Sequence, residues 1–236
     1  MVWQDRGSDG LFEVVAQRVS VDGVPIGSNI QLSNPGGFND ESPSIASGLT
    51  TVGVAFANGQ AGLQAIRFRT FEQETLQPVS DLLDLTSGQS EAVYPTVIWN
   101  EDRYVIAWYD NTAASRSIFA MSVAEDGTIL QQATPVSSPP GGARSRYPSL
   151  LPLGDRVLMV YADNRDNNNG YELYTRMLNN DLVPISPESR LTNAPFNSVY
   201  PISTFGPDGN VGILFRDDRE GEQHVFFTRL DCVTAP

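Results

Sequence analysis

Hydrophobic and polar residues alternate along the chain in short stretches that are separated by turn residues. Between residues 94 and 137 four such stretches follow one another, at 94–99, 104–109, 117–123 and 134–137. Alternation with a period of two is typical of β-strands, and the Asn, Asp and Gly residues between the stretches favour turns. Runs long enough to form an amphipathic helix are interrupted by Gly, Pro or β-branched residues. The pattern therefore predicts an all-β fold.

The alternating pattern recurs with a period of about 53 residues. Three Tyr-Pro pairs and one Ser-Pro pair place their prolines at Pro43, Pro95, Pro148 and Pro201. In every unit an aromatic residue is followed two positions later by Asp or Asn, at Trp3/Asp5, Phe56/Asn58, Trp108/Asp110, Tyr161/Asp163 and Phe215/Asp217. Five copies at near-constant spacing indicate a repeat architecture.

Four short strands in a unit of about 50 residues are typical of the blade of a β-propeller, whereas a β-sandwich does not repeat its sequence in this way. We predict one propeller domain over residues 1–236, with five blades of up to four antiparallel strands. The predicted blades cover about 1–38, 39–89, 90–142, 143–195 and 196–236. Trp3 aligns with Trp108 and Phe215, so the first and last blades are expected to be incomplete, with about eighteen strands in all. Unfilled strand positions expose backbone donors and acceptors, so we also expect self-association.

The units resemble a family of bacterial propeller repeats that are sialidase-like or lectin-like. The resemblance is carried by the Tyr-Pro pair that opens three of the units and by the aromatic-x-Asp-x-Arg segments at 161–165 and 215–219. It implies a secreted or cell-surface protein that binds carbohydrate, mediates adhesion, hydrolyses glycosides or serves as a scaffold. The Ser-x-Asp-x-Gly-x-Thr-Trp box of many sialidases is absent from this sequence.

Charge and composition narrow the classes of partner. The sequence holds 15 basic residues, all of them Arg, against 28 acidic residues, which gives a formal net charge of −13. A protein that binds the phosphate backbone of nucleic acid needs an excess of basic residues, so nucleic acid is excluded as a partner. No run approaches the roughly 20 apolar residues that cross a bilayer, so we expect no membrane insertion. A single His224 and a single Cys232 exclude a multi-histidine metal site and an internal disulfide.

Residues that recur in every unit are better explained by a structural need than by a reaction, which would need them only once. We expect the repeated acidic residues to close the turn after the second strand by accepting backbone N–H bonds. The guanidinium groups of Arg165 and Arg219 suit carboxylates, and we favour a bond between blades over a bond to an acidic sugar. The structural repeat motif therefore comprises Asp5, Asp110, Asp163, Asp217, Arg165 and Arg219.

Unrepeated polar residues near the Tyr-Pro pairs are the candidate ligand-binding residues. Four residues before the four prolines the sequence has Asn39, Glu91, Arg144 and Asn197, and Arg146 adds another charge. Tyr94, Tyr147 and Tyr200 could stack on a sugar ring and hydrogen-bond it, although packing at the top of each blade is the alternative. The start of the first strand and the end of the second meet on one face of a propeller. We predict that a ligand binds on this face, near Glu91, Arg144 and Arg146.

The sequence favours a binding protein over an enzyme. A glycosidase needs two carboxylates, and the innermost strands expected at 42–47, 94–99, 147–152 and 200–205 contain neither Asp nor Glu. The oxygen-rich segment 163–170 resembles a calcium loop but lacks the distal Glu of an EF-hand, so no cofactor is expected and Ca²⁺ is a weaker alternative. The predicted function is non-enzymatic, lectin-like carbohydrate binding or adhesion, with a glycan or another protein as partner. The alternatives are a sialidase-like glycoside hydrolase and a scaffold module cut from a longer repeat protein.

Overall fold

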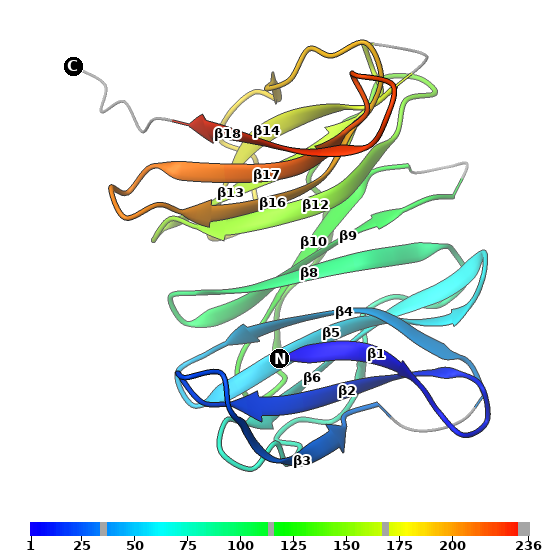
Figure 1. The fold of residues 1–236 in the computed structure, drawn as a ribbon, viewed down its shortest axis with the longest axis vertical. Helices are drawn as coiled ribbons and strands as arrows, with labels where there is room; N and C mark the ends of the chain where they lie inside the picture. Colours follow the sequence, from blue (N-terminus) through cyan, green and yellow to red (C-terminus); the bar gives the residue numbers. More distant parts are fainter. Residues whose placement is uncertain (34–36, 113–115, 167–169, 231–236) are drawn as a thin grey trace.

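The computed structural model describes residues 1–33, 37–112, 116–166 and 170–230, which form eighteen β-strands in five antiparallel sheets (Figure 1). The first sheet contains β1 (Val2–Arg6), β2 (Phe12–Val19) and β3 (Pro25–Gln31). The second contains β4 (Asn39–Ser47), β5 (Thr51–Gln60), β6 (Leu63–Glu72) and β7 (Leu83–Asp84). The third contains β8 (Ala92–Asn100), β9 (Arg103–Asp110), β10 (Ile118–Val123) and β11 (Ile129–Pro135). The fourth contains β12 (Ser145–Pro152), β13 (Arg156–Asp163), β14 (Glu172–Asn179) and β15 (Ser189–Arg190), and the fifth contains β16 (Ser198–Phe205), β17 (Val211–Asp217) and β18 (His224–Leu230).

Each sheet is a meander in which strands that follow one another in the sequence are paired. The first and second sheets lie in the lower part of Figure 1, the third crosses the middle, and the fourth and fifth lie in the upper part. The first and fifth sheets have three strands and the other three have four, so the predicted five-bladed propeller with incomplete first and last blades is confirmed. No helix in the described part of the chain is long and apolar enough to cross a membrane.

The middle strands of the second, third and fourth sheets are buried on both faces because each of these sheets is covered by a neighbour on either side. Along β5 every residue from Thr51 to Gly59 is buried, and β9 and β13 are buried over most of their length. A strand covered on both faces reads as a continuous apolar run rather than as an alternating one. The apolar runs of the sequence therefore mark the centres of the blades.

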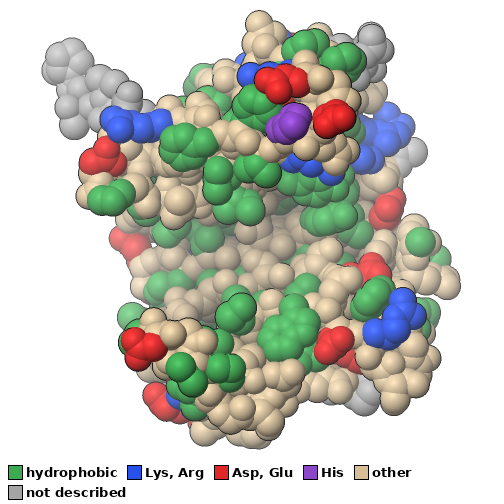
Figure 2. Space-filling view, in the orientation of Figure 1, with side chains coloured by type: hydrophobic (Ala, Val, Ile, Leu, Met, Phe, Trp, Pro, Cys, Tyr) green, Lys and Arg blue, Asp and Glu red, His purple; other side chains and the backbone are tan. Residues whose placement is uncertain are grey.

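The repeated aromatic residue of each blade packs against the blade before it. Phe56 lies in the buried cluster between the first two sheets, Trp108 between the second and third, Tyr161 between the third and fourth, and Phe215 between the fourth and fifth. These four side chains are almost fully buried, whereas Trp3, at the equivalent position of the first blade, is half-buried. Among the described residues, no buried cluster joins the first sheet to the fifth. In the view of Figure 2, the surface of the molecule is hollowed between the upper and lower sheets.

The strand bounds correct two expectations. The first strands begin two or three residues before the Ser-Pro or Tyr-Pro pair, so β4 contains Asp40 and Glu41, and the expectation that no innermost strand carries a carboxylate is wrong. The pairing continues on both sides of the Pro because an irregularity inside the strand takes up the residue that lacks an N–H. The last strand of the third blade, β11, begins at Ile129, five residues earlier than the predicted 134–137. The hydrophobic pattern did not reveal this start because most residues of β11 are exposed and lack the apolar alternation of a covered strand.

Candidate ligand-binding site at the propeller axis

The four first strands β4, β8, β12 and β16 lie side by side around the axis and share one backbone irregularity. Their pairing with the second strand shifts at the Ser-Pro or Tyr-Pro pair in every blade. The residue before the proline has φ of 53° at Ser42, 51° at Tyr94, 54° at Tyr147 and 54° at Tyr200. A bulky residue rarely adopts this left-handed conformation, and such strain often marks functional sites. The repeated Tyr-Pro pair is therefore a bulge inside the strand rather than its beginning.

The bulge brings three tyrosines from three blades together. The ring centroids of Tyr147 and Tyr200 are 4.0 Å apart, and those of Tyr94 and Tyr147 are 5.2 Å apart. The Tyr200 hydroxyl donates to the Tyr147 hydroxyl at 3.3 Å, and Tyr109 of β9 stacks on Tyr94 at 5.7 Å. Three tyrosines that lie 53 positions apart in sequence thus form, together with Tyr109, one aromatic cluster at the axis. We call it the axial tyrosine cluster: Tyr94, Tyr109, Tyr147 and Tyr200.

An open cavity of ≈ 400 Å³ lies beside this cluster. Its lining is the bulge of each first strand, namely residues 42–44, 94–96, 147–149 and 200–202. The volume falls within the roughly 300–1,000 Å³ of small-molecule sites. Tyr94 is 41% exposed, so its ring is accessible from solvent. The cavity is apolar at its prolines and offers hydroxyl groups at its serines and tyrosines, as a sugar site requires.

A chain of polar contacts borders the axial tyrosine cluster. Glu91 accepts a hydrogen bond from the Asn111 amide at 2.6 Å, and Arg146 donates from Nη2 to Asn111 Oδ1 at 2.8 Å. The Arg146 guanidinium lies 5.6 Å from the ring centre of Tyr109. Cations over aromatic faces are held by the ring quadrupole, which keeps this arginine against the cluster.

A second arginine reaches the cluster from the fifth blade. The guanidinium of Arg216 lies 4.7 Å from the centre of the Tyr200 ring. Glu41 on β4 stands immediately before the bulge, where its charge acts on Tyr94. Positive and negative groups therefore both border the cluster.

The hydroxyls of Tyr94 and Tyr147 keep their protons across the physiological range. Burial, and then the neighbouring Tyr200, raise the pKa of Tyr147 to about 12. Burial, followed by Tyr200 and Glu41, also raises the pKa of Tyr94, and Arg146 opposes this effect. A neutral phenol both donates and accepts hydrogen bonds. Tyr94 and Tyr147 thus offer hydrogen-bonding groups that stay neutral near pH 7.

The structure brings together most of the predicted ligand-binding residues. Glu91 and Arg146 are joined through Asn111 beside the tyrosines, but Arg144 lies in a separate cavity with Arg165. Asn39 and Asn197, at equivalent positions, accept backbone N–H groups from the preceding blade.

Four residues of this region are not among the ligand-binding residues that the sequence predicts. They are Glu41, Tyr109, Asn111 and Arg216. Glu41 could have been found by comparing the positions directly before the four bulges, where Arg146 is its counterpart. Tyr109 and Asn111 border the repeated Asp110, but nothing in the repeat distinguishes them.

The repeated acidic residues bind the backbone of their own turn in three of the four blades. Asp110, Asp163 and Asp217 accept from the backbone N–H two residues later, at 2.8 Å in each case. Each also accepts a serine hydroxyl, from Ser90, Ser145 and Ser198 in that order. Asp5 is exposed and accepts only from the next N–H, at 2.9 Å, because the first blade has no strand inside β1 to supply such a serine. In the second blade the pair is reversed, since Asp40 of β4 accepts from Asn58 of β5 at 2.7 Å.

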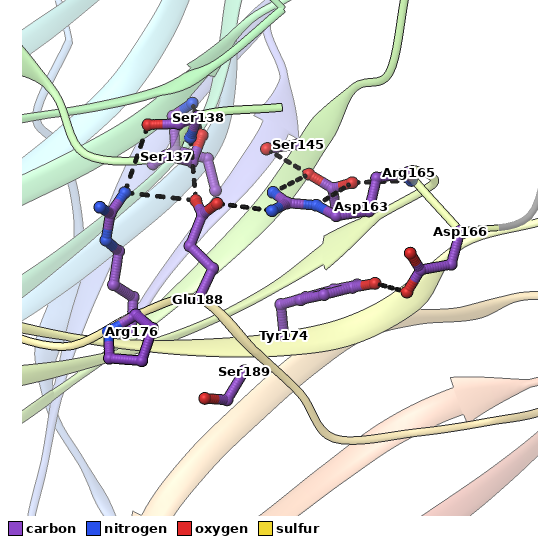
Figure 3. Close-up of polar contacts among 12 residues, drawn as sticks. Ser137, Ser138, Ser145, Asp163, Arg165, Asp166, Tyr174, Arg176, Glu188 and Ser189 are labelled. Carbon is purple, nitrogen blue, oxygen red and sulfur yellow. Dashed lines mark hydrogen bonds and ion pairs between the residues drawn. The ribbon is translucent and has the colours of Figure 1, made fainter. Parts of the chain in front are cut away.

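Arg165 and Arg219 clamp the carboxylate of their own blade. Arg165 donates to both oxygens of Asp163 at 2.9 Å, and Arg219 donates to those of Asp217 at 2.8 and 2.7 Å. Arg165 also donates to Glu188, which accepts the Ser138 N–H of the third blade (Figure 3). The Arg165 motif therefore reaches the neighbouring blade through a glutamate that the repeat did not reveal.

No group of three or more His, Cys, Asp or Glu side chains among the described residues is arranged to hold a metal ion. In the segment 163–170, residues 167–169 lie outside the described part of the chain, as does Cys232. The carboxylate of Asp163 accepts from Arg165 and Ser145, and that of Asp166 accepts from Tyr174 (Figure 3). Arg190 also donates to the Asp166 carboxylate, at 3.4 Å.

The fold is that of a β-propeller, and comparison with known proteins agrees with it. No family model and no curated protein matches the sequence. Among solved structures, the chain is similar to an endo-arabinase from Bacteroides thetaiotaomicron, with a TM-score of 0.60 and 9% identity over 98% of this chain and 93% of that one. It is also similar to an exo-1,5-alpha-L-arabinanase from a bovine ruminal metagenomic library, with a TM-score of 0.56 and 10% identity over 98% of this chain and 92% of that one. A subtype N10 neuraminidase-like protein of A/little yellow-shouldered bat has a TM-score of 0.53 and 9% identity over 82% of this chain and 59% of that one. At these identities the similarity shows the fold alone, and the resemblance to sialidase-like propellers holds at that level.

Proposed function

We propose that the protein binds a carbohydrate at the propeller axis, on the axial tyrosine cluster. The observation that carries this proposal is the convergence of Tyr94, Tyr147 and Tyr200 on an open cavity, each at a strained backbone position. A blade that needed only packing at this point would be served by a smaller residue, as Ser42 shows in the second blade. Tyrosine pairs an apolar face, which stacks on the C–H face of a sugar, with a hydroxyl that bonds its ring hydroxyls.

The solved structures with this fold support carbohydrate as the class of ligand. Two of those compared above are named for their action on arabinan, and both align over more than nine-tenths of their own length. Fold alone does not transfer an activity, so the ligand class rests on the tyrosines first and on these neighbours second.

Hydrolysis of a glycoside is the second candidate, and the names of the neighbours favour it over binding alone. Such a reaction needs one carboxylic acid that protonates the leaving oxygen and one carboxylate that activates water or attacks the sugar. Glu41 on the innermost strand β4 and Glu91 before β8 are the two carboxylates that border the axial tyrosine cluster. We place binding first because the residues that line the cavity include no carboxylate and Glu91 is already bonded to Asn111.

A binding assay with a parallel test of turnover decides between these functions. Purified protein is titrated with neutral oligosaccharides, arabinan fragments included, by calorimetry, and released reducing ends are measured in the same samples. Tyr94→Ala should weaken binding about tenfold, since a lost aromatic contact of roughly 1.4 kcal/mol corresponds to that factor. Phe227→Ala removes an exposed aromatic side chain from β18 and serves as the matched control.

The outcomes separate the two functions clearly. Binding without release of reducing ends supports a lectin-like protein. Release of reducing ends that Glu41→Gln or Glu91→Gln abolishes, with binding retained, establishes the hydrolase. If Tyr94→Ala binds every tested glycan as tightly as the unmodified protein does, the axial site is wrong.

A further inference from the structure

A second cavity, of ≈ 390 Å³, lies where the third and fourth blades meet. Arg116, which precedes β10, forms one side, and Arg144, Asn164 and Arg165 form the other. The backbone segment 140–143 completes the lining, which contains no acidic side chain. Three arginines therefore line one cavity in a protein whose formal net charge is −13.

The free arginine of this cavity is Arg144. Its backbone is held on both sides by Asn164, whose side-chain oxygen accepts the Arg144 N–H at 2.7 Å and whose N–H donates to the Arg144 carbonyl at 3.3 Å. Within the described ranges of the chain, its guanidinium makes no hydrogen bond or ion pair. The base of the side chain is thus fixed while all five of its N–H donors remain available.

Arg116 leaves a donor unused as well. Its Nη1 donates to the Gly142 carbonyl at 3.0 Å, but its buried Nε has no hydrogen-bond partner among the described residues. The residue also has a φ of 49°, which an ordinary side chain rarely adopts. This Nε is enclosed by the protein, so only the Nη groups of Arg116 can offer donors to a ligand in the cavity.

Arg165 contributes shape rather than free charge, because its guanidinium is neutralised by Asp163 and Glu188. The uncompensated charge of the cavity is therefore that of Arg116 and Arg144. We infer that this cavity binds an oxyanion between the guanidinium groups of Arg116 and Arg144. Carboxylate, sulfate and phosphate share the geometry that a guanidinium fork binds through two parallel hydrogen bonds.

The oxyanion can come from two sources, either a free inorganic ion or an acidic group carried by a glycan. The site does not depend on the axial tyrosine cluster, since no residue lines both cavities. Failure of one proposal therefore leaves the other standing.

Titration with sodium sulfate tests the site, with ionic strength held constant by sodium chloride. The unmodified protein should show saturable binding of one sulfate, and Arg144→Met should weaken it at least tenfold without loss of the fold, because the Arg144 guanidinium has no partner among the described residues and its backbone bonds to Asn164 are kept. Arg144→Lys keeps the charge but not the fork and should bind with intermediate affinity. Arg156→Met is the matched control, since Arg156 starts β13 at the end opposite Asp163 and pairs only with the exposed Asp155.

Absence of saturable binding, or equal affinity of Arg144→Met and the unmodified protein, would overturn the proposal. Equal weakening by Arg156→Met would also overturn it, because the effect would then be one of net charge. A sulfated chondroitin tetrasaccharide and its desulfated form identify the source of the anion. Binding of the sulfated form at least tenfold tighter than inorganic sulfate, lost in Arg144→Met, supports a glycan-borne group, and a sulfated form that binds no tighter than inorganic sulfate supports a free ion. The desulfated form keeps its uronate carboxylates, so its affinity tells whether the sulfate or the carboxylate of the glycan is bound.

Discussion

Replacing Glu188 with alanine should loosen the contact between the third and fourth blades. One carboxylate oxygen accepts the Ser138 N–H at 2.8 Å and Arg176 Nη1 at 3.3 Å, and the other accepts Arg165 Nη1 at 2.5 Å (Figure 3). The Glu188 side chain is only 10% exposed, and the two arginines are 14% and 16% exposed. Ser138 belongs to the third blade and the arginines to the fourth, so one carboxylate joins two blades.

The size of the effect follows from what each partner retains. Removing one member of a buried ion pair costs roughly 3–5 kcal/mol when the other charge is left alone. Arg165 keeps Asp163, and Arg176 keeps the Val136 carbonyl at 3.0 Å, so the lower end applies. We expect Glu188→Ala to lose about 3 kcal/mol of unfolding free energy. In a chain of this size that loss lowers Tm by roughly 6–12 °C.

The effect should depend on pH with a defined sign. Burial acts to raise the pKa of Glu188, but the bonds from Arg165 and from the Ser138 N–H outweigh it and hold this pKa below its ordinary value. A carboxyl whose folded pKa is depressed stabilises the protein above the unfolded pKa and loses that contribution as the pH falls through the folded one. The difference in stability between the unmodified protein and Glu188→Gln should therefore shrink as the solution is acidified through this range.

Urea unfolding at pH 7, repeated at a series of lower pH values, measures both effects. Glu74→Ala is the control, because Glu74 forms an exposed pair with Arg18 that should contribute roughly 0–1 kcal/mol. If Glu188→Ala unfolds within about 1 kcal/mol of the unmodified protein at pH 7, the carboxylate does not hold this contact as the buried-pair estimate requires.

Two further substitutions test the packing of the second and third blades. Glu125, in the turn after β10, accepts the N–H groups of Thr50 and Thr51 at 2.8 and 2.9 Å, so Glu125→Ala should cost about 2 kcal/mol in the same unfolding assay; an unchanged urea midpoint would mean that water replaces these bonds without loss. A Cβ at Gly53 would lie 2.7 Å from Tyr104 Cε1 and 2.8 Å from Phe68 Cζ, so Gly53→Ala should cost roughly 1–3 kcal/mol; a variant as stable as the unmodified protein would show that the two rings move aside freely.

The sequence alone determined how many blades the protein has and in which strand the first one begins. Both follow from spacing, because each blade is a local meander whose strands pair with their sequence neighbours. The aromatic residues that mark the second strands, Trp108 and Tyr161 among them, occur at a fixed distance since every blade must cover the one before it. A pattern of this kind is revealed by periodicity along the chain.

Only the tertiary structure decided what the recurring and unrepeated residues do. The bulge at each Tyr-Pro pair turns the tyrosines toward the axis. This bulge is a shift in the register of two paired strands, so the local sequence around Tyr94 or Tyr200 does not show that these side chains come together. Arg144 and Arg146 are two residues apart, yet Arg146 borders the axial tyrosine cluster and Arg144 lines a separate cavity. Glu188 binds a residue fifty positions earlier in the chain, in another blade. Such contacts depend on how whole sheets pack against each other, and a period read along the chain carries no record of that packing.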